Sequence, residues 1–194
     1  MTKYAEENNM KAYLIFISIA ILSACSTVAD PFTENNSVIS AQPYIGLQER
    51  VHRNELKELL DVDPVRTEWC AAFVNSVLEI DSIPNLNDQD KYPPLMARSF
   101  LYWGDKVEPA DIQRGDVVVF PRGDQGWKGH VGFYVDSQMH NGKEYWIVLG
   151  GNQSNEVRYD FYSPSASLGI RRYSKELINT NVNNRAALRG LMQK

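Results

Sequence analysis

The sequence lacks an excess of positive charge. Its 194 residues carry a net charge of −4, and nothing in this overall balance indicates the clustered basic face that binds nucleic acid, so we expect no nucleic-acid partner. With 43% hydrophobic and 23% charged residues, the composition suits one globular domain with a real core and does not match a disordered chain. The sequence contains no internal repeats.

Near the N-terminus, the apolar run is too short to cross a membrane. The run "AYLIFISIAILSA" covers residues 12–24, whereas a spanning helix needs roughly 20 residues. It is typical of a secretion signal, and it leads into "LSAC" (residues 22–25), which resembles a bacterial lipoprotein processing box. We therefore expect a signal peptide over 1–24, with Met10 as an alternative start, and lipidation of Cys25. The alternative is an uncleaved short anchor.

Cysteine is scarce, since the chain has two. Lipidation of Cys25 would leave Cys70 without a disulfide partner, so Cys70 is either buried and inert or exposed and reactive. Residues 25–43 are predicted to form the lipidated cysteine and a flexible tether, because this segment is polar, contains two prolines and lacks a helical period.

The segment from Tyr44 to Leu60 has helical spacing of apolar residues, interrupted by a slip of one residue. A second helix is predicted over 68–78, with Thr67 as its N-cap. Its expected apolar face consists of Trp69, Ala72, Phe73, Val77 and Ile80. A third, short helix is predicted over 95–103, ending at Gly104.

Five short apolar and aromatic runs follow: "GDVVVF", "HVGFYV", "EYWIVLGG", "EVRYDFY" and "LGIRRY". The pair Asn141-Gly142 between the second and third runs indicates a β-hairpin. Helices followed by strands predict an α+β domain with an antiparallel sheet. The tail over 174–194 is basic and either contacts an anionic envelope surface or is a solvated face.

Cys70 has features of a nucleophile. The predicted N-cap would put it at the third helical position, where unpaired N–H groups and the helix dipole lower the pKa of a thiol. The alternative is a small buried hydrophobic residue. His130 opens a predicted strand in an apolar context and is the candidate base. Asn152, at the end of the next strand, is the candidate that orients the imidazole, or else an ordinary turn residue.

Four motifs in order, "WCAAFVN", "GDVVVF", "GHVGFYV" and "VLGGNQ", resemble the CHAP-type cysteine hydrolases, which are related to the NlpC cell-wall peptidases. The resemblance covers residues 44–173. It implies a reduced papain-like fold in which the nucleophile helix packs on a small antiparallel sheet. It further implies Cys70 as nucleophile, His130 as general base and then acid, and Asn152 as the orienting residue.

Some positions depart from that family. Trp69 precedes the cysteine where many relatives have Gln or Ser, and Gly150 stands where many have a glutamate. Glu68, Trp69 and Gln153 are candidate substrate-binding residues. The backbone N–H of Cys70 is the expected oxyanion donor, and the second donor is not identified.

The resulting prediction is a monomeric, lipid-anchored hydrolase that cleaves amide bonds of peptidoglycan, as an endopeptidase or an N-acetylmuramoyl-L-alanine amidase. It needs no cofactor and no metal, since Cys70 and His130 alone cannot make a zinc site. Ser26 after the lipidated cysteine resembles lipoproteins sent to the outer membrane. The alternatives are a catalytically silent peptidoglycan-binding lipoprotein and an acyltransferase or deamidase on the same scaffold.

Overall fold

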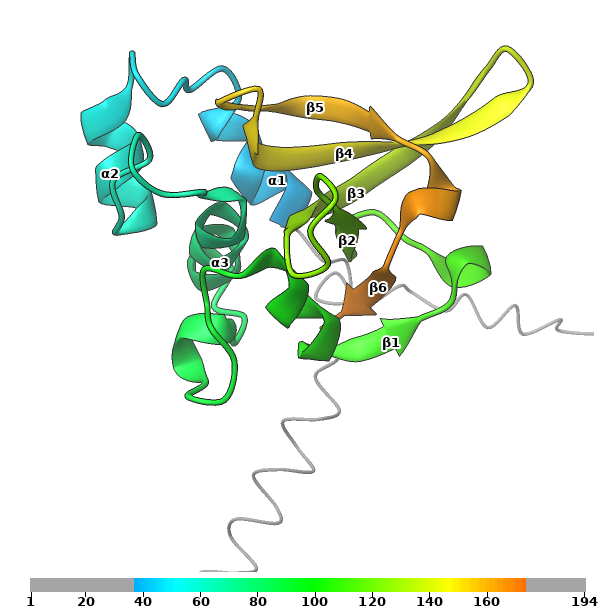
Figure 1. Ribbon diagram of the computed structural model, residues 1–194, viewed down its shortest axis with the longest axis horizontal. Helices are drawn as coiled ribbons and strands as arrows, with labels where there is room; N and C mark the ends of the chain where they lie inside the picture. The colour runs from blue at the N-terminus through cyan, green and yellow to red at the C-terminus, as the bar shows by residue number, and fades with distance from the viewer. Residues whose placement is uncertain (1–36, 174–194) are drawn as a thin grey trace, which may run out of the picture. The chain divides into compact units, whose positions relative to one another are not determined.

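Residues 37–173 are described in the computed structural model (Figure 1). The predicted signal peptide over 1–24, the lipidation site Cys25 and the basic tail over 174–194 lie outside the described residues. Within 37–173, none of the helices is both long enough and apolar enough to cross a membrane.

Helices come first along the chain and strands later. The α-helices are α1 (Ser37–Ala41), α2 (Arg53–Leu60) and α3 (Cys70–Ile80), and 3-10 turns cover Gln42–Tyr44, Leu86–Asp88, Ala97–Tyr102, Pro109–Asp111 and Pro164–Ala166. The strands are β1 (Asp105–Val107), β2 (Val117–Pro121), β3 (Gly129–His140), β4 (Lys143–Gln153), β5 (Glu156–Tyr162) and β6 (Gly169–Arg172). They form one sheet in the order β1-β6-β2-β3-β4-β5, with every neighbouring pair antiparallel. The predicted α+β class is confirmed.

Both faces of the sheet are apolar near its centre. One face packs against α1 and α3, and its strand residues include Val117, Val119, Val131 and Phe133. The other face carries a smaller cluster that includes Val118, Phe120, Tyr134, Trp146, Val148 and Ile170. Successive side chains of a strand point to opposite faces, so a strand covered on both sides is apolar throughout. This arrangement explains the uninterrupted "VVVF" of β2.

The turn between β3 and β4 is the predicted hairpin. Asn141 and Gly142 connect the strands and have φ values of 50° and 73°. A two-residue turn with both φ values positive matches the right-handed twist of the flanking strands, and Asn-Gly is the pair that adopts it most readily. The hairpin extends well beyond the other strands (Figure 1).

The start of the domain differs from the prediction. Residues 37–43 are not part of a tether, because α1 buries Val38 and Ala41, and the Ser37 hydroxyl donates to Asp81 at the end of α3. A five-residue helix is too short to reveal a helical period in the sequence. The helical spacing predicted from Tyr44 to Leu60 is confirmed only for α2 and is wrong before it, since residues 45–52 form turns and a bridge between Gln48 and Glu156 of β5.

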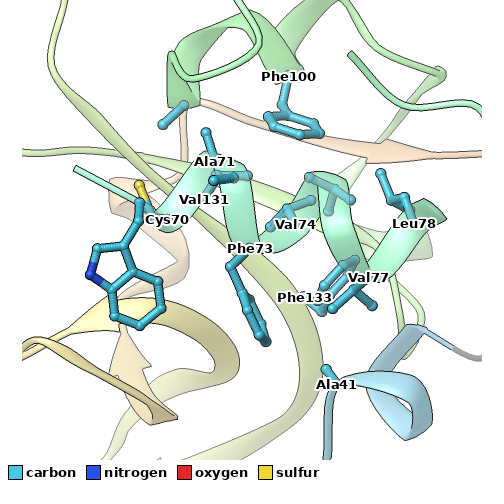
Figure 2. Packing of buried hydrophobic residues seen from close by; sticks show 14 of the residues in the cluster. Ala41, Cys70, Ala71, Phe73, Val74, Val77, Leu78, Phe100, Val131 and Phe133 are labelled. Atoms are coloured by element: carbon cyan, nitrogen blue, oxygen red, sulfur yellow. The ribbon is translucent and has the colours of Figure 1, made fainter. Parts of the chain in front are cut away.

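The helix that carries Cys70 starts two residues later than predicted. Thr67 is not its N-cap, because α3 begins at Cys70 and Trp69 takes the cap position without a side-chain cap bond. Cys70 therefore occupies the first helical position. Figure 2 shows Cys70 at this end of α3 and the buried side chains that follow it along the helix. Ile80, predicted on the apolar face, is largely exposed.

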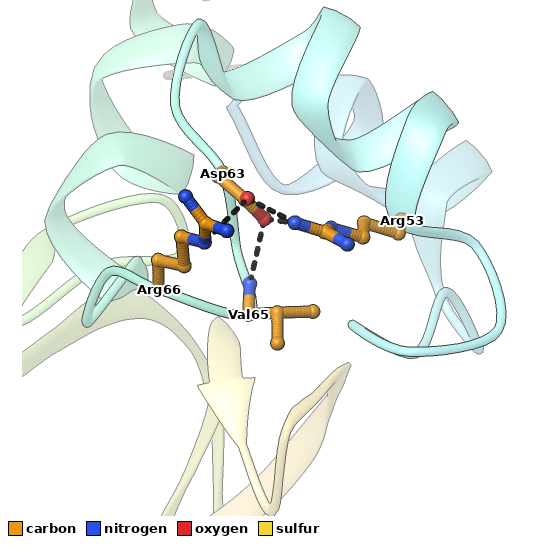
Figure 3. A network of polar contacts seen from close by, with 4 residues as sticks. All are labelled: Arg53, Asp63, Val65 and Arg66. Atoms are coloured by element: carbon orange, nitrogen blue, oxygen red, sulfur yellow. Dashed lines mark hydrogen bonds and ion pairs between the residues drawn. The ribbon is translucent and has the colours of Figure 1, made fainter.

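An ionic network stabilises the loop between α2 and α3. The Asp63 carboxylate accepts a bidentate contact from Arg53, a hydrogen bond from the Val65 N–H and an ion pair from Arg66 (Figure 3). The hydrogen bond from Arg53 is the main reason that the pKa of Asp63 falls to about 2. This network fixes the chain shortly before it reaches Glu68 and Cys70.

Candidate active site

The Cys70 thiol lies between the N-terminus of α3 and the start of β3. The backbones of Val131, the residue after His130, and of Ala71, in the first turn of α3, lie close enough to its sulfur to lower the pKa of the thiol. Helix N-termini have unpaired N–H groups, so the Ala71 contact follows from the position of Cys70. The structure thus brings together two segments that are 60 residues apart in the sequence.

Burial dominates the electrostatics of this thiol. Cys70 is only 3% exposed, and burial raises its pKa, while the charge of Arg122 and the two backbone contacts act in the opposite direction. The predicted lowering of the Cys70 pKa is therefore wrong for this conformation. Desolvation disfavours the charged form of a buried thiol and here outweighs the helix terminus.

The imidazole of His130 is held by Gln153. His130 Nε2 lies 3.1 Å from Gln153 Oε1, and His130 is 4% exposed. The amide nitrogen of Gln153 donates to three backbone carbonyls, those of Val148, Gly150 and Arg158, which fixes the amide orientation and leaves Oε1 as the acceptor. His130 Nε2 must then carry the hydrogen, so Nδ1 has the free lone pair.

Tyr162 completes this chain of hydrogen bonds. Its hydroxyl donates to Gln153 Oε1 over 2.9 Å, and its ring stacks on the His130 imidazole with centroids 5.5 Å apart. Burial raises the pKa of Tyr162, which keeps the phenol protonated as a donor. Burial also lowers the pKa of His130 to about 4, and Arg122 adds to this effect. At neutral pH the imidazole is uncharged and able to accept a proton at Nδ1.

Gln153 reaches His130 because β4 contains a bulge. The register of β4 with β5 shifts between Gly150, which pairs with Arg158, and Gln153, which pairs with Glu156. The extra residue in β4 brings the Gln153 side chain to the face on which Gly150 lies. Asn152, within the bulge, adopts a left-handed backbone conformation with a φ of 57°. A Cβ on Gly150 would lie 3.3 Å from His130 Nε2, so this position faces the imidazole.

Asn152 is buried next to the site but does not contact the imidazole. Its side-chain Nδ2 donates to Glu68 Oε2 over 2.8 Å, and its backbone carbonyl accepts from Arg122 Nη2 over 3.4 Å. The side-chain contact with the imidazole that was predicted for Asn152 is made by Gln153 instead. Gln153 is in turn only 2% exposed, so it is not a residue that lines a substrate cleft.

Arg122 is a residue of this centre that the sequence did not reveal. It follows β2, and its Nη1 lies 3.2 Å from Glu68 Oε2. Its charge affects the pKa values of Cys70, His130 and Tyr162, which means that all three groups lie around one guanidinium. The only signal in the sequence is the turn "PRG" between two motifs, which does not distinguish a site residue from a loop residue.

Trp69 has a structural role and cannot contact a substrate in this conformation, which corrects the prediction. Its ring is fully buried, and its Nε1 donates to Glu49 over 3.3 Å. A Cβ on Gly151 would come within 2.5 Å of the indole, so β4 packs directly against it. Glu68, by contrast, has a side chain that is 79% exposed.

The other histidines lie away from this centre. His52 precedes α2 and accepts a hydrogen bond from the Gln48 N–H, and His140 is exposed at the end of β3. Within residues 37–173, the His130 imidazole makes no hydrogen bond to the Cys70 thiol, and no group of three or more His, Cys, Asp or Glu side chains could hold a metal ion.

A scan of the chain against models of protein families returns no match, and a search of curated proteins returns none either.

Proposed function

We propose that this protein is a secreted, lipid-anchored cysteine hydrolase of reduced papain-like fold that cleaves amide bonds of peptidoglycan through Cys70, His130 and Gln153. The observation that carries the proposal is the approach of the Val131 backbone to the Cys70 thiol, which is close enough to lower the pKa of the thiol. This contact joins the N-terminus of α3 to the residue next to His130. A thiol at a helix N-terminus beside an oriented neutral imidazole is the arrangement of an activated cysteine nucleophile.

The protonation states suit general-base catalysis from a neutral pair. The Cys70 sulfur attacks the carbonyl carbon of the substrate while its proton passes to His130 Nδ1. The backbone N–H of Cys70, at the first position of α3, donates to the oxyanion. Collapse of the intermediate breaks the C–N bond, and the leaving amine takes the proton from Nδ1.

Water then hydrolyses the thioester. His130 Nδ1 removes a proton from the attacking water, the new carboxylic acid leaves, and the sulfur recovers its proton. Throughout the cycle Gln153 Oε1 accepts the Nε2 hydrogen and stabilises the imidazolium that forms in each step. Hydrogen bonds of this kind tighten when substrate binds, so a resting thiol that does not yet contact the imidazole is compatible with this cycle.

Digestion of purified sacculi tests the proposal. The wild-type protein is expected to release soluble peptide-containing fragments, identified by mass spectrometry, and Cys70→Ala is expected to release none. Undiminished release by Cys70→Ala would rule the mechanism out. Mass spectrometry of the fragments also identifies the bond that is cut, and fractionation of membranes tests the proposed outer-membrane location.

A second candidate function is supported by the burial of Cys70. With a pKa raised by burial and 3% exposure, the thiol resembles an inert core residue, which suits a silent lipoprotein that binds stem peptides and links wall to membrane. Retained binding to sacculi together with an unreactive Cys70 at neutral pH would favour this binder over the hydrolase.

A further inference from the structure

We infer that Arg122 forms a subsite for a carboxylate of the substrate next to Cys70, and that Glu68 occupies this subsite in the resting protein. The substrate class is an acidic peptide whose carboxylate lies close to the amide that is cut. This inference rests on the proposed function and specifies its substrate.

The first support is the geometry of the Arg122 guanidinium. Its Nη2 is anchored by the backbone carbonyl of Asn152. Its Nη1 is buried and, among the residues the structure describes, lacks an aligned hydrogen-bond acceptor. Glu68 Oε2 lies 3.2 Å from Nη1 and forms an ion pair with it, but the direction of approach does not meet the geometry of a hydrogen bond. A buried guanidinium nitrogen without an acceptor can still bind a carboxylate oxygen.

The second support is the difference in exposure between the two partners. The Arg122 side chain is 39% exposed, whereas the Glu68 side chain is 79% exposed. Exposed ion pairs contribute little to stability, so little free energy opposes movement of Glu68 into solvent. Asn152 Nδ2, which now donates to Glu68, would then be free to donate to the incoming carboxylate.

The third support is distance along the chain. Glu68 lies two residues before Cys70, so their Cα atoms are at most about 7 Å apart. The charge of the Glu68 carboxylate also acts on the Cys70 thiol, whose pKa it raises. A carboxylate that replaces the one on Glu68 would therefore lie close to the reacting sulfur. The exchange substitutes one negative charge for another, so the charge around Cys70 and His130 is unchanged when the substrate binds.

Competition between two small alkylating agents provides the test. Iodoacetate carries a carboxylate, and iodoacetamide is its neutral analogue of nearly equal size. Limited access to the buried thiol slows both reagents equally, so it does not affect the ratio of their rates. Modification of Cys70 in the full chain is measured by peptide mass spectrometry, which separates it from Cys25. This readout does not depend on peptidoglycan cleavage, so it remains informative if the proposed hydrolase activity is absent.

We expect the ratio of iodoacetate to iodoacetamide rates to fall about tenfold in Arg122→Gln, the scale of one lost charge-assisted hydrogen bond. The ratio should rise in Glu68→Gln and be largely retained in Arg122→Lys. Arg114→Gln is the matched control, because Arg114 is an exposed arginine that precedes β2, whereas Arg122 follows it. Thermal melting of each variant verifies folding.

An unchanged ratio in Arg122→Gln, or an equal fall in Arg114→Gln, would overturn the inference. Failure of both reagents to modify Cys70 would also overturn it, since a subsite that a two-carbon acid cannot enter does not bind a substrate. If cleavage is observed, Arg122→Gln should raise KM for a stem peptide with a free carboxylate and leave KM for its amidated analogue unchanged.

Discussion

Gln153 and His130 are joined by a 3.1 Å hydrogen bond that determines which ring nitrogen of the histidine carries its hydrogen. The same Gln153 oxygen accepts from Tyr162, and the Gln153 nitrogen is committed to backbone carbonyls. The amide cannot turn over without losing these bonds. The free lone pair of His130 is therefore fixed on Nδ1 by groups that themselves take no part in bond breaking.

Replacement of Gln153 by alanine should impair the chemical step. We expect kcat on a soluble stem peptide to fall roughly 100-fold with little change in KM, because the ring loses its orientation and the support for its positive charge. Gln153→Glu should retain more activity and raise the pKa of His130, which shifts the pH–rate profile upward.

Asn152→Gly is the comparison for that variant. Glycine accepts the positive φ at this position, and the Asn152 side chain does not touch the imidazole. Its kcat should fall much less than that of Gln153→Ala. Equal losses of kcat in the two variants would contradict the assignment of Gln153 as the orienting residue.

The stability of the fold should depend on pH through His130. Its pKa is lowered from 6.5 to about 4, mainly by burial, so the unfolded chain binds a proton that the folded chain resists. This contribution is fully present above pH 6.5, declines as the pH falls, and is lost below about 4. The shift corresponds to about 3 kcal/mol.

Urea unfolding at pH 7, 5.5 and 4.5 measures this dependence. His130→Asn has no group that titrates in this range, so its free energy of unfolding should decline less than that of the wild type over the same interval. Parallel curves for the two proteins would show that His130 is not buried in its neutral form.

The ion pair between Arg172 and Asp116 should contribute substantially to the stability of the fold. Asp116 is 1% exposed and accepts two hydrogen bonds from Arg172, which joins the end of β6 to the residue before β2. Arg172→Ala leaves a buried carboxylate without its partner and should lower the free energy of unfolding by about 3 kcal/mol.

Lys106→Ala is the control for the ion pair. Lys106 lies in β1, the edge strand next to β6, and its side chain pairs with Glu108, the residue after β1. Both side chains are exposed. We expect a loss below about 1 kcal/mol in urea unfolding. A loss as large as that of Arg172→Ala would mean that burial does not distinguish the two pairs.

Gly151→Ala should strain the packing beneath the nucleophile. The added Cβ would come within 2.5 Å of the Trp69 ring and 2.6 Å of Phe73 Cβ. Overpacking of this kind costs about 2 kcal/mol, measured by urea unfolding, and displacement of Trp69 should also slow alkylation or cleavage at Cys70. Gly126→Ala, where the Cβ meets open space, should leave both measurements unchanged.

Local patterns in the sequence were sufficient to predict much of this fold. The Asn141-Gly142 turn, the strand runs and the helix that begins near Cys70 are all encoded by residues close to one another in the chain. The class of the fold follows from their order. The sequence also identified Cys70 and His130 as candidates, because an unpaired cysteine and a histidine in an apolar strand are both unusual.

The rest of the site depends on features that a linear pattern does not reveal. If side chains along β4 alternated strictly, Gly150 and Asn152 would lie on the same face of the sheet. The bulge between Gly150 and Gln153 shifts this alternation by one residue, so Gln153 shares that face instead. The direction of the Cys70 pKa shift depends on burial by distant segments. The ion pair between Arg122 and Glu68 joins the segment after β2 to the segment before α3, which are far apart in the sequence.

The most direct test of the account is a search for the acyl-enzyme on Cys70. The protein is mixed with a peptidoglycan stem peptide, quenched in acid within the first turnover, and digested for peptide mass spectrometry. We predict that the peptide containing Cys70 gains the mass of the acyl fragment and loses it on treatment with hydroxylamine. Cleavage of the stem peptide with no adduct on Cys70, and at an equal rate in Cys70→Ala, would contradict the account.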